Sequence, residues 1–290
     1  MNGALVRAAE LWVSPSEDNG VLLGAFQRAS EIEETALPTL RRTSGGPAIR
    51  VAPGSLHLAL ALTHPAALTP CDTPRLVNRY VRPLMRALSS FGEKTPYFGR
   101  DWLAAQHRPV AWVGFAHDSS SKRALLEAVI GVHATWSLDR NRASFLGKPE
   151  ITLEEAVGHT IEMNAVVVAV VKEFANTFDG ERAEAPCIET SPLEIDDDPK
   201  WMATTDEAIG TVAAGYDRKG RLKIGGQFLA SRDAVARLED RVTSFDRSTG
   251  LDVIGAAVDA ELTRPGVAIH GVKSLISIRD VIARVLSLAS

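Results

Sequence analysis

The sequence predicts a protein of the α/β (α+β) class, in which a mixed or antiparallel sheet packs against helices and a small α+β domain follows. Three observations support this prediction. Up to about residue 136, short runs rich in Val, Leu and aromatic residues alternate with turn-forming residues. A long apolar stripe with helical period comes next. After a polar segment, a hairpin pattern leads into three amphipathic stretches.

Five segments of the first part have the composition of strands. They are ALVRAAELW, GVLLGAF, LHLALAL, RPVAWVGFAH and ALLEAVIGVHATW, and Ser, Pro, Gly or Asp clusters separate them. In the third segment leucine recurs at every second position, which predicts a strand with one apolar face.

Two amphipathic helices are predicted between and after these strands. The first covers 73–91, where Thr73 and Pro74 are typical start signals and Pro83 predicts a kink. The second covers 152–178, because Thr152 and Glu155 have capping-box spacing and the apolar residues that follow keep helical period. We expect the second helix to pack across the sheet.

Composition changes at DGERAEAPCIETSPLEIDDDPKW, which contains eight carboxylates and three prolines but little periodic apolar content. We therefore expect a first domain at 1–180, a linker at 181–200 and a C-terminal accessory domain at 201–290. In the last of these, TVAAGYDRKGRLKIGGQFL predicts a hairpin, and helices are expected near 232–244, 251–262 and 274–288.

Charge and composition exclude several classes of partner. The 290 residues carry a net charge of -4, which gives no general attraction to nucleic acid or to an anionic membrane. No apolar run reaches the roughly 18 residues of a membrane helix, and no signal-peptide pattern is present, so we expect a cytoplasmic protein. Cys71 and Cys187 lack disulfide or metal-ligand spacing, and no metal site is expected.

The stretch RRTSGGPAIRVAPGSLHLALAL resembles the arginine- and glycine-rich loop and the next strand of the lipoate-protein ligases, within the wider biotin and lipoate ligase and octanoyltransferase group. The family has a third glycine and an asparagine where this chain has Pro47 and Ser55. RPVAWVGFA resembles the family's strand with Lys-Val-x-Gly-x-Ala, and GYDRKGRLKIGGQFLAS resembles its accessory domain. The likeness covers nearly the whole chain in order and spacing.

The resemblance implies a fold of the biotin/lipoate-ligase type and a reaction in two steps. The carboxylate of lipoate or octanoate attacks the α-phosphate of ATP in the presence of Mg²⁺, and the acyl group of the adenylate then passes to a lysine of a lipoyl-type carrier protein or domain. The family's opening helix has no counterpart in this sequence, which leaves a partner subunit as an open alternative.

The matched motifs also imply substrate-binding residues. Glycines would let the backbone approach the acyl chain and nucleotide, and arginines would bind phosphate or carboxylate oxygens. His57 would donate a hydrogen bond, on a strand whose Ala59 and Ala61 leave room for the acyl chain. The expected residues are Arg41, Arg42, Gly45, Gly46, Pro47, Ala48, His57, Asp101, Gly114 and Ala116.

The lysine of the family's strand is replaced here, with its place falling on Arg108 or Pro109. Loss of such a preorganised cation costs about 2 to 4 kcal/mol of transition-state stabilisation, so another cation should take its role. Arg108 is the expected catalytic residue, although a planar guanidinium differs from a compact ammonium. Lys122, in the loop DSSSKRALL, is the reserve.

Other interpretations of these features stay open. A Gly-Gly pair beside arginines is also typical of a solvated turn, and His57 could instead be a structural histidine. His117, in its polar loop, is expected to be exposed. The protein is then either an active ligase or a non-catalytic acyl-binding or regulatory relative. A weaker alternative is adenylate-independent acyl transfer through Cys187, because APCIET resembles the Pro-Cys-Gly of the octanoyltransferases. The acid itself, lipoate, octanoate or biotin, is left open.

Overall fold

The computed structural model describes residues 8–29, 32, 36–138, 149–179, 199–207 and 209–288. Among these, residues of 1–19, 50–115 and 121–189 form one compact unit, here called the sheet unit, and residues of 20–49, 116–120 and 190–290 form a second, the C-terminal unit. The predicted linker at 181–200 lies almost wholly outside the described residues, so the boundary between sequence domains stays a prediction.

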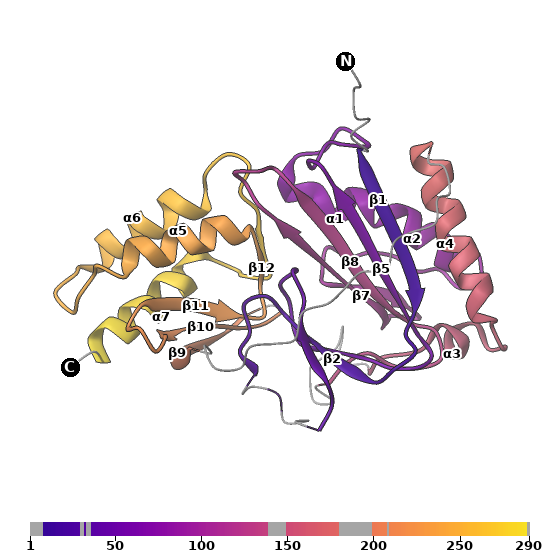
Figure 1. Ribbon diagram of the computed structural model, residues 1–290, viewed down its shortest axis with the longest axis horizontal. Coiled ribbons are helices and arrows are strands. Elements are labelled where there is room, and N and C mark those ends of the chain that lie inside the picture. Colours follow the sequence, from indigo (N-terminus) through magenta and orange to yellow (C-terminus); the bar gives the residue numbers. More distant parts are fainter. Residues whose placement is uncertain are drawn as a thin grey trace, which may run out of the picture. The chain divides into compact units, whose positions relative to one another are not determined.

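The sheet unit is built on a five-stranded sheet with the order β1-β5-β8-β7-β6 (Figure 1). β5 pairs antiparallel with both β1 and β8, and β6 pairs antiparallel with β7. The predicted fold class, helices packed on a largely antiparallel sheet, is thus confirmed. The strands are β1 (Ala9–Pro15), β5 (Ser55–Leu62), β6 (Trp102–Ala105), β7 (Arg108–His117) and β8 (Ala124–Gly131).

Helices α1, α2 and α4 of this unit lie along one face of the sheet (Figure 1). A predicted helix at 73–91 is present in three pieces, with the break near Pro83 that the sequence indicated. The single helix predicted at 152–178 is wrong, because Gly158 takes a left-handed φ of 76° and ends the first piece. The helices are η2 (Thr73–Arg75), α1 (Leu76–Tyr80), α2 (Arg82–Ser89), α3 (Leu153–Val157) and α4 (Met163–Phe178).

Helices α2 and α4 pack against each other, and polar contacts add to this packing. The guanidinium of Arg86 on α2 lies 3.0 Å from the carboxylate of Glu173 on α4. In addition, the ring of Tyr80 on α1 packs near that of Phe178 on α4, with the centroids 5.6 Å apart. Because these contacts join helices far apart in the sequence, they fix the helical layer of the sheet unit.

The two faces of β5 differ in exposure, as the alternating pattern predicts. Its four leucines, at 56, 58, 60 and 62, are at most 3% exposed. On the opposite face His57 and Ala61 remain partly exposed. The second face therefore offers small and polar side chains in the middle of the sheet.

The C-terminal unit contains a three-stranded antiparallel sheet with the order β11-β10-β9 and three helices. The predicted hairpin is formed by β10 (Gly210–Tyr216) and β11 (Leu222–Gly226). The predicted helices correspond to α5 (Arg232–Val242), α6 (Leu251–Leu262) and α7 (Leu275–Leu288). Strand β9 (Lys200–Glu207) was not predicted.

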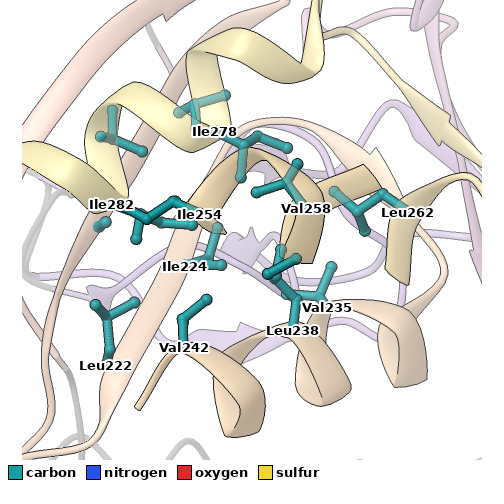
Figure 2. Packing of buried hydrophobic residues seen from close by; sticks show 14 of the residues in the cluster. Leu222, Ile224, Val235, Leu238, Val242, Ile254, Val258, Leu262, Ile278 and Ile282 are labelled. Atoms are coloured by element: carbon teal, nitrogen blue, oxygen red, sulfur yellow. The ribbon is translucent and has the colours of Figure 1, made fainter. Parts of the chain in front are cut away.

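An aliphatic core holds this unit together (Figure 2). The side chains that the three helices and β11 turn towards one another are almost fully buried, and burial of this kind contributes roughly 1.5 to 3 kcal/mol for each large side chain. They include Leu222, Ile224, Val235, Leu238, Val242, Ile254, Val258, Leu262, Ile278 and Ile282.

The early segment 20–49 joins the C-terminal unit through aromatic and backbone contacts. Phe26 stacks on Phe228 with ring centroids 4.8 Å apart, and the Gly226 N–H donates to the carbonyl of Phe26 at 2.8 Å. The segment carries β2 (Gly20–Leu23) and β3 (Thr39–Arg41), which pair parallel, and leads into β4 (Ile49–Val51). Two further short strands, β12 (Leu229–Ala230) and β13 (Ile269–His270), pair antiparallel.

Candidate functional site

The glycine pair of the Arg41–Ala48 loop lies against the backbone of Phe228, inside the C-terminal unit. The N–H of Gly46 donates to the Phe228 carbonyl at 3.0 Å, and Gly46 has a φ of 93°. A β-carbon on Gly45 would come within 2.4 Å of the same carbonyl oxygen. Both positions therefore require glycine for the fold itself, one for its conformation and the other for space.

Arg42 is only 7% exposed, and its guanidinium holds the loop together. Its Nε donates to the hydroxyl of Ser44 at 3.1 Å, and its Nη1 donates to the carbonyl of Leu22 at 2.6 Å. Its Nη2 donates to the carbonyls of Gly45 at 2.7 Å and Pro47 at 2.6 Å. Four N–H donors are thus directed at oxygens of the protein.

Arg41 also contacts backbone carbonyls, those of Gly24 at 3.3 Å and of Gln27. Ala48 at the end of the loop is partly exposed. The structure thus brings Arg41 to Ala48 together as one ordered loop whose arginines stabilise its own backbone. A role of these residues in binding phosphate or carboxylate stays a prediction.

His57 lies on the more open face of β5, next to Ala59. The strand register places Trp12 of β1 and Glu127 of β8 on either side of Ala59. Glu127 is 6% exposed, and its Oε1 lies 3.7 Å from Nε2 of His57. This face therefore combines small side chains with an imidazole and a carboxylate. Glu127 was not among the residues expected from the sequence, although a charged residue within the apolar run ALLEAVIG is a signal.

Asp101 and Gly114 come together where β6 and β7 pair. Asp101 is 1% exposed, and its carbonyl accepts a hydrogen bond at 2.8 Å from the N–H of Val113, the residue before Gly114. Burial, and secondarily the charge of Asp101, raises the pKa of Tyr97. Ala116, two residues beyond Gly114 on β7, is buried and groups with the C-terminal unit.

The two candidate catalytic cations lie at opposite ends of β7. Arg108 begins the strand, and its guanidinium donates to the carbonyls of Pro149, at 2.9 Å, and Glu150. Lys122 is exposed in the turn after the strand, with a φ of 61°. At ~3.3 Å per residue, the ten residues of β7 span about 30 Å. The two cations therefore cannot serve one reacting centre in this conformation.

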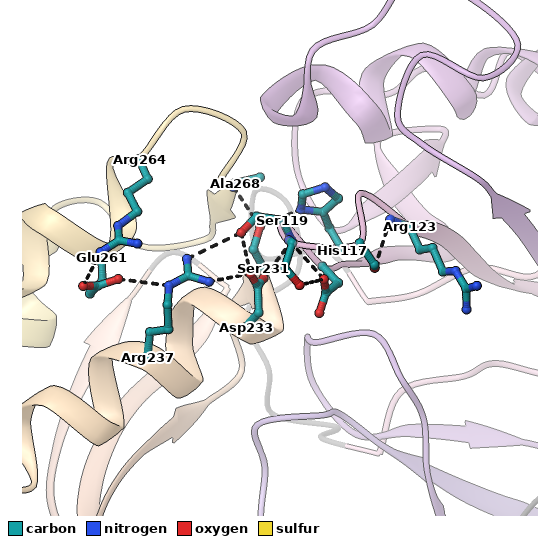
Figure 3. Close-up of polar contacts among 12 residues, drawn as sticks. His117, Ser119, Arg123, Ser231, Asp233, Arg237, Glu261, Arg264 and Ala268 are labelled. Atoms are coloured by element: carbon teal, nitrogen blue, oxygen red, sulfur yellow. Dashed lines mark hydrogen bonds and ion pairs between the residues drawn. The ribbon is translucent and has the colours of Figure 1, made fainter.

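A polar cluster fixes the end of β7 to the start of α5 within the C-terminal unit (Figure 3). Nδ1 of His117 lies 2.9 Å from the hydroxyl of Ser231. The N–H of Ser119 donates to Asp233 at 2.8 Å, and the guanidinium of Arg237 lies 2.6 Å from the same carboxylate. His117 is 3% exposed, so the expectation of an exposed histidine is wrong.

A polar cleft of about 480 Å³ lies in the sheet unit, lined by residues that include Asn19, Arg50, His133, Thr152 and Glu155. Nε of Arg50 is buried and has no hydrogen-bond partner among the described residues. Nδ1 of His133 lies 2.8 Å from the carboxylate of Glu154, and this hydrogen bond lowers the Glu154 pKa.

This cleft was not expected from the sequence, because its residues come from segments far apart in the chain. Arg50 lies within the predicted arginine- and glycine-rich loop, and Thr152 and Glu155 were expected only as a helix cap. Within the described residues no group of three or more His, Cys, Asp or Glu is arranged to hold a metal ion. The same part of the chain contains no helix with the length and apolarity needed to cross a membrane. Cys71 has a free thiol, and Cys187 lies outside the described residues.

Comparison with known proteins defines the class of fold. No protein-family model and no curated protein matches the sequence. Among solved structures, the chain matches LipL1 of P. falciparum in complex with lipoate, with a TM-score of 0.57 and 13% identity, over 95% of this chain and 87% of that one.

Two further solved structures match over shorter parts of the chain. One is a bipartite lipoate protein ligase from Thermoplasma acidophilum, with a TM-score of 0.49 and 16% identity over 62% of this chain and 75% of that chain. The other is a lipoate-protein ligase A bound with ATP, with a TM-score of 0.47 and 15% identity over 62% and 77%. The match to LipL1 shows that the chain has a fold of the lipoate-protein ligase type, and the resemblance found in the sequence is confirmed at the level of the fold.

Proposed function

We propose that the protein is a lipoate-protein ligase-like enzyme. It activates lipoate or a related medium-chain acid with ATP and transfers the acyl group to a lysine of a lipoyl-type carrier protein. The observation that carries this proposal is the match to LipL1 in complex with lipoate, which extends over 95% of the chain.

The more open face of the five-stranded sheet is the proposed place of the acyl chain. Ala59 and Ala61 on β5 leave space, because an alanine side chain ends at its β-carbon. Trp12 on the neighbouring strand provides an apolar wall beside Ala59. A chain of methylene groups laid there would exchange water for apolar contacts, which contributes about 0.8 kcal/mol for each CH₂ group.

The polar cleft is the proposed place of the nucleotide phosphates. The buried Nε of Arg50 suits a phosphate oxygen, since a guanidinium forms strong, charge-assisted hydrogen bonds with such groups. Glu155, which lines the cleft, and Glu154, which contacts the lining residue His133, would repel free phosphates. We therefore expect ATP to bind as its Mg²⁺ complex, because Mg²⁺ is commonly held by phosphates together with one or two carboxylates.

Acid-dependent exchange of pyrophosphate into ATP tests the activation step. We expect exchange when lipoate or octanoate is present and none when the acid is omitted. Arg50→Gln should lower the exchange rate about tenfold or more, since it removes a charge that contacts the phosphates. Arg123→Gln, which changes an exposed arginine of the same unit, is the matched control.

A non-catalytic acyl-binding relative is the second candidate function. The contacts of Arg108 favour it, because its guanidinium already donates to the carbonyls of Pro149 and Glu150. In that case the parent protein would show no pyrophosphate exchange above background. The acid would still raise the melting temperature, since a ligand that binds only the folded state stabilises it by about 2.7 kcal/mol at a hundred times its Kd.

A further inference from the structure

His57 and Glu127 form a pair in which the carboxylate is buried and the imidazole reaches solvent. The side chain of Glu127 is 8% exposed and that of His57 is 37% exposed, with 3.7 Å between Oε1 and Nε2. Glu127 lies directly opposite Ala59 on the neighbouring strand, and His57 lies opposite Val129. The two residues are therefore diagonal neighbours on one face of the sheet, within reach of each other.

The position of this pair is fixed by the sheet. β5 lies between β1 and β8, so both strands that carry the pair are held by backbone hydrogen bonds. Nε2 of His57 and Oε1 of Glu127 are 3.7 Å apart, which is an ion-pair distance rather than a hydrogen bond. In the neutral tautomer with the hydrogen on Nε2, Nδ1 is the acceptor on the other side of the ring. The arrangement thus places an imidazole, which can accept a proton, beside a buried carboxylate.

The transfer step of the proposed function needs such an acceptor. A lysine has a pKa of about 10.4, so at neutral pH only about one amine in a few thousand lacks its extra proton. The ammonium form has no lone pair and cannot attack the acyl carbon. A general base at the site typically accelerates a step of this kind by about 10² to 10⁴.

We propose that His57 is the general base of acyl transfer and that Glu127 is its positioning residue; this inference rests on the proposed function. Nδ1 of His57 takes the proton that the carrier ammonium must lose. The amine nitrogen then bonds to the acyl carbon, the bond from that carbon to the phosphate oxygen breaks, and AMP leaves with the electron pair. The second proton of the nitrogen and the proton held by His57 pass to water. Besides Glu127, the charged group on this face among the paired residues of β1, β5 and β8 is Glu10.

The test separates the two half-reactions. Transfer is measured with supplied lipoyl-adenylate and a lipoyl-type carrier domain, and activation is measured as pyrophosphate exchange. We expect His57→Gln to lower the transfer rate about a hundredfold or more, and to lower it much more than the exchange rate. Added imidazole and higher pH should restore part of the lost rate. Glu127→Gln should lower transfer about tenfold and shift its pH profile, whereas Glu162→Gln, a change of the exposed glutamate that precedes α4, should leave transfer at the parent rate.

Three outcomes would overturn the assignment of His57 and Glu127. They are transfer at the parent rate in both variants, an equal loss of transfer and exchange in both, and a loss that neither imidazole nor pH restores. A parent protein that transfers from supplied adenylate but shows no exchange would contradict the activation step alone, with the base still supported. No transfer by the parent would reject both. The melting temperature of each variant is measured first, and Glu127→Gln alone carries the test if His57→Gln does not fold.

Discussion

His117 illustrates at the scale of one residue how burial changes the chemistry of a side chain. It is 3% exposed, and its Nδ1 contacts the hydroxyl of Ser231, which in turn accepts a hydrogen bond from the N–H of Ala268 at 3.0 Å. Burial lowers the pKa of His117, and the nearby charges of Asp233 and Asp118 act in the opposite direction without cancelling it.

A pH dependence of stability follows from this direction. The unfolded chain takes up a proton at His117 near the ordinary value of about 6.5, whereas the folded protein does so only at lower pH. The stability that neutral His117 contributes to the folded state is thus fully present above about pH 6.5, and it is lost as the pH falls below that value. Urea unfolding should show that the free energy of unfolding decreases less between about pH 7.5 and about pH 5.5 for His117→Asn than for the parent.

The control for this prediction is His159→Asn, which changes an exposed histidine. It should lose as much stability as the parent between the two pH values. If His117→Asn and the parent lost equal stability between the two pH values, His117 would make no contribution to the pH dependence of stability.

Other single residues show what sequence patterns could and could not predict. The loop around Arg42 and the glycine pair was recognised as special, since Gly45 and Gly46 have few alternatives at such positions. The partner that makes them special, the backbone of Phe228, is about 180 residues away and leaves no local signal. His117 was expected to be exposed because the adjoining DSSSK is polar. Its contact with Ser231 could not be foreseen, because a partner far away in the sequence leaves no local signal.

At the scale of elements, strands and helices with strong periodicity were predicted well. Leu251 to Leu262 forms α6 as expected, and the alternating leucines lie on one face of β5. Two errors have local causes. Gly158 interrupts a helix that the periodicity of apolar residues alone predicts to be continuous. β9 lies beside an acidic stretch whose composition is typical of a linker.

The segment between α4 and β9 leads to a prediction about proteolysis. Its sequence has four glutamates, at 181, 184, 189 and 194, with little periodic apolar content. A protease that cleaves after glutamate should therefore cut there first and release a C-terminal fragment of about 100 residues. Glu173 is the internal control, because it lies within α4 and pairs with Arg86. First cleavage after Glu173 would contradict the proposed boundary near residue 180.

At the scale of the whole molecule, the order of elements predicted more than any single motif. The fold of the lipoate-protein ligase type was recognisable although Pro47 and Ser55 depart from the family pattern. The grouping of residues 20–49 and 116–120 with the C-terminal unit was not recognisable. Such grouping depends on contacts between distant segments, and one sequence does not reveal them.

The central claim, acylation of a carrier lysine at the expense of ATP, is tested most directly by the mass of a carrier. A lipoyl-type carrier domain is incubated with the protein, ATP, Mg²⁺ and lipoate, and parallel samples lack ATP or carry the carrier with its acceptor lysine replaced by arginine. We predict that the carrier gains the mass of one lipoyl group in the complete mixture and in neither parallel sample. An unchanged carrier mass with lipoate, octanoate and biotin, under conditions in which the protein is folded, would contradict the claim.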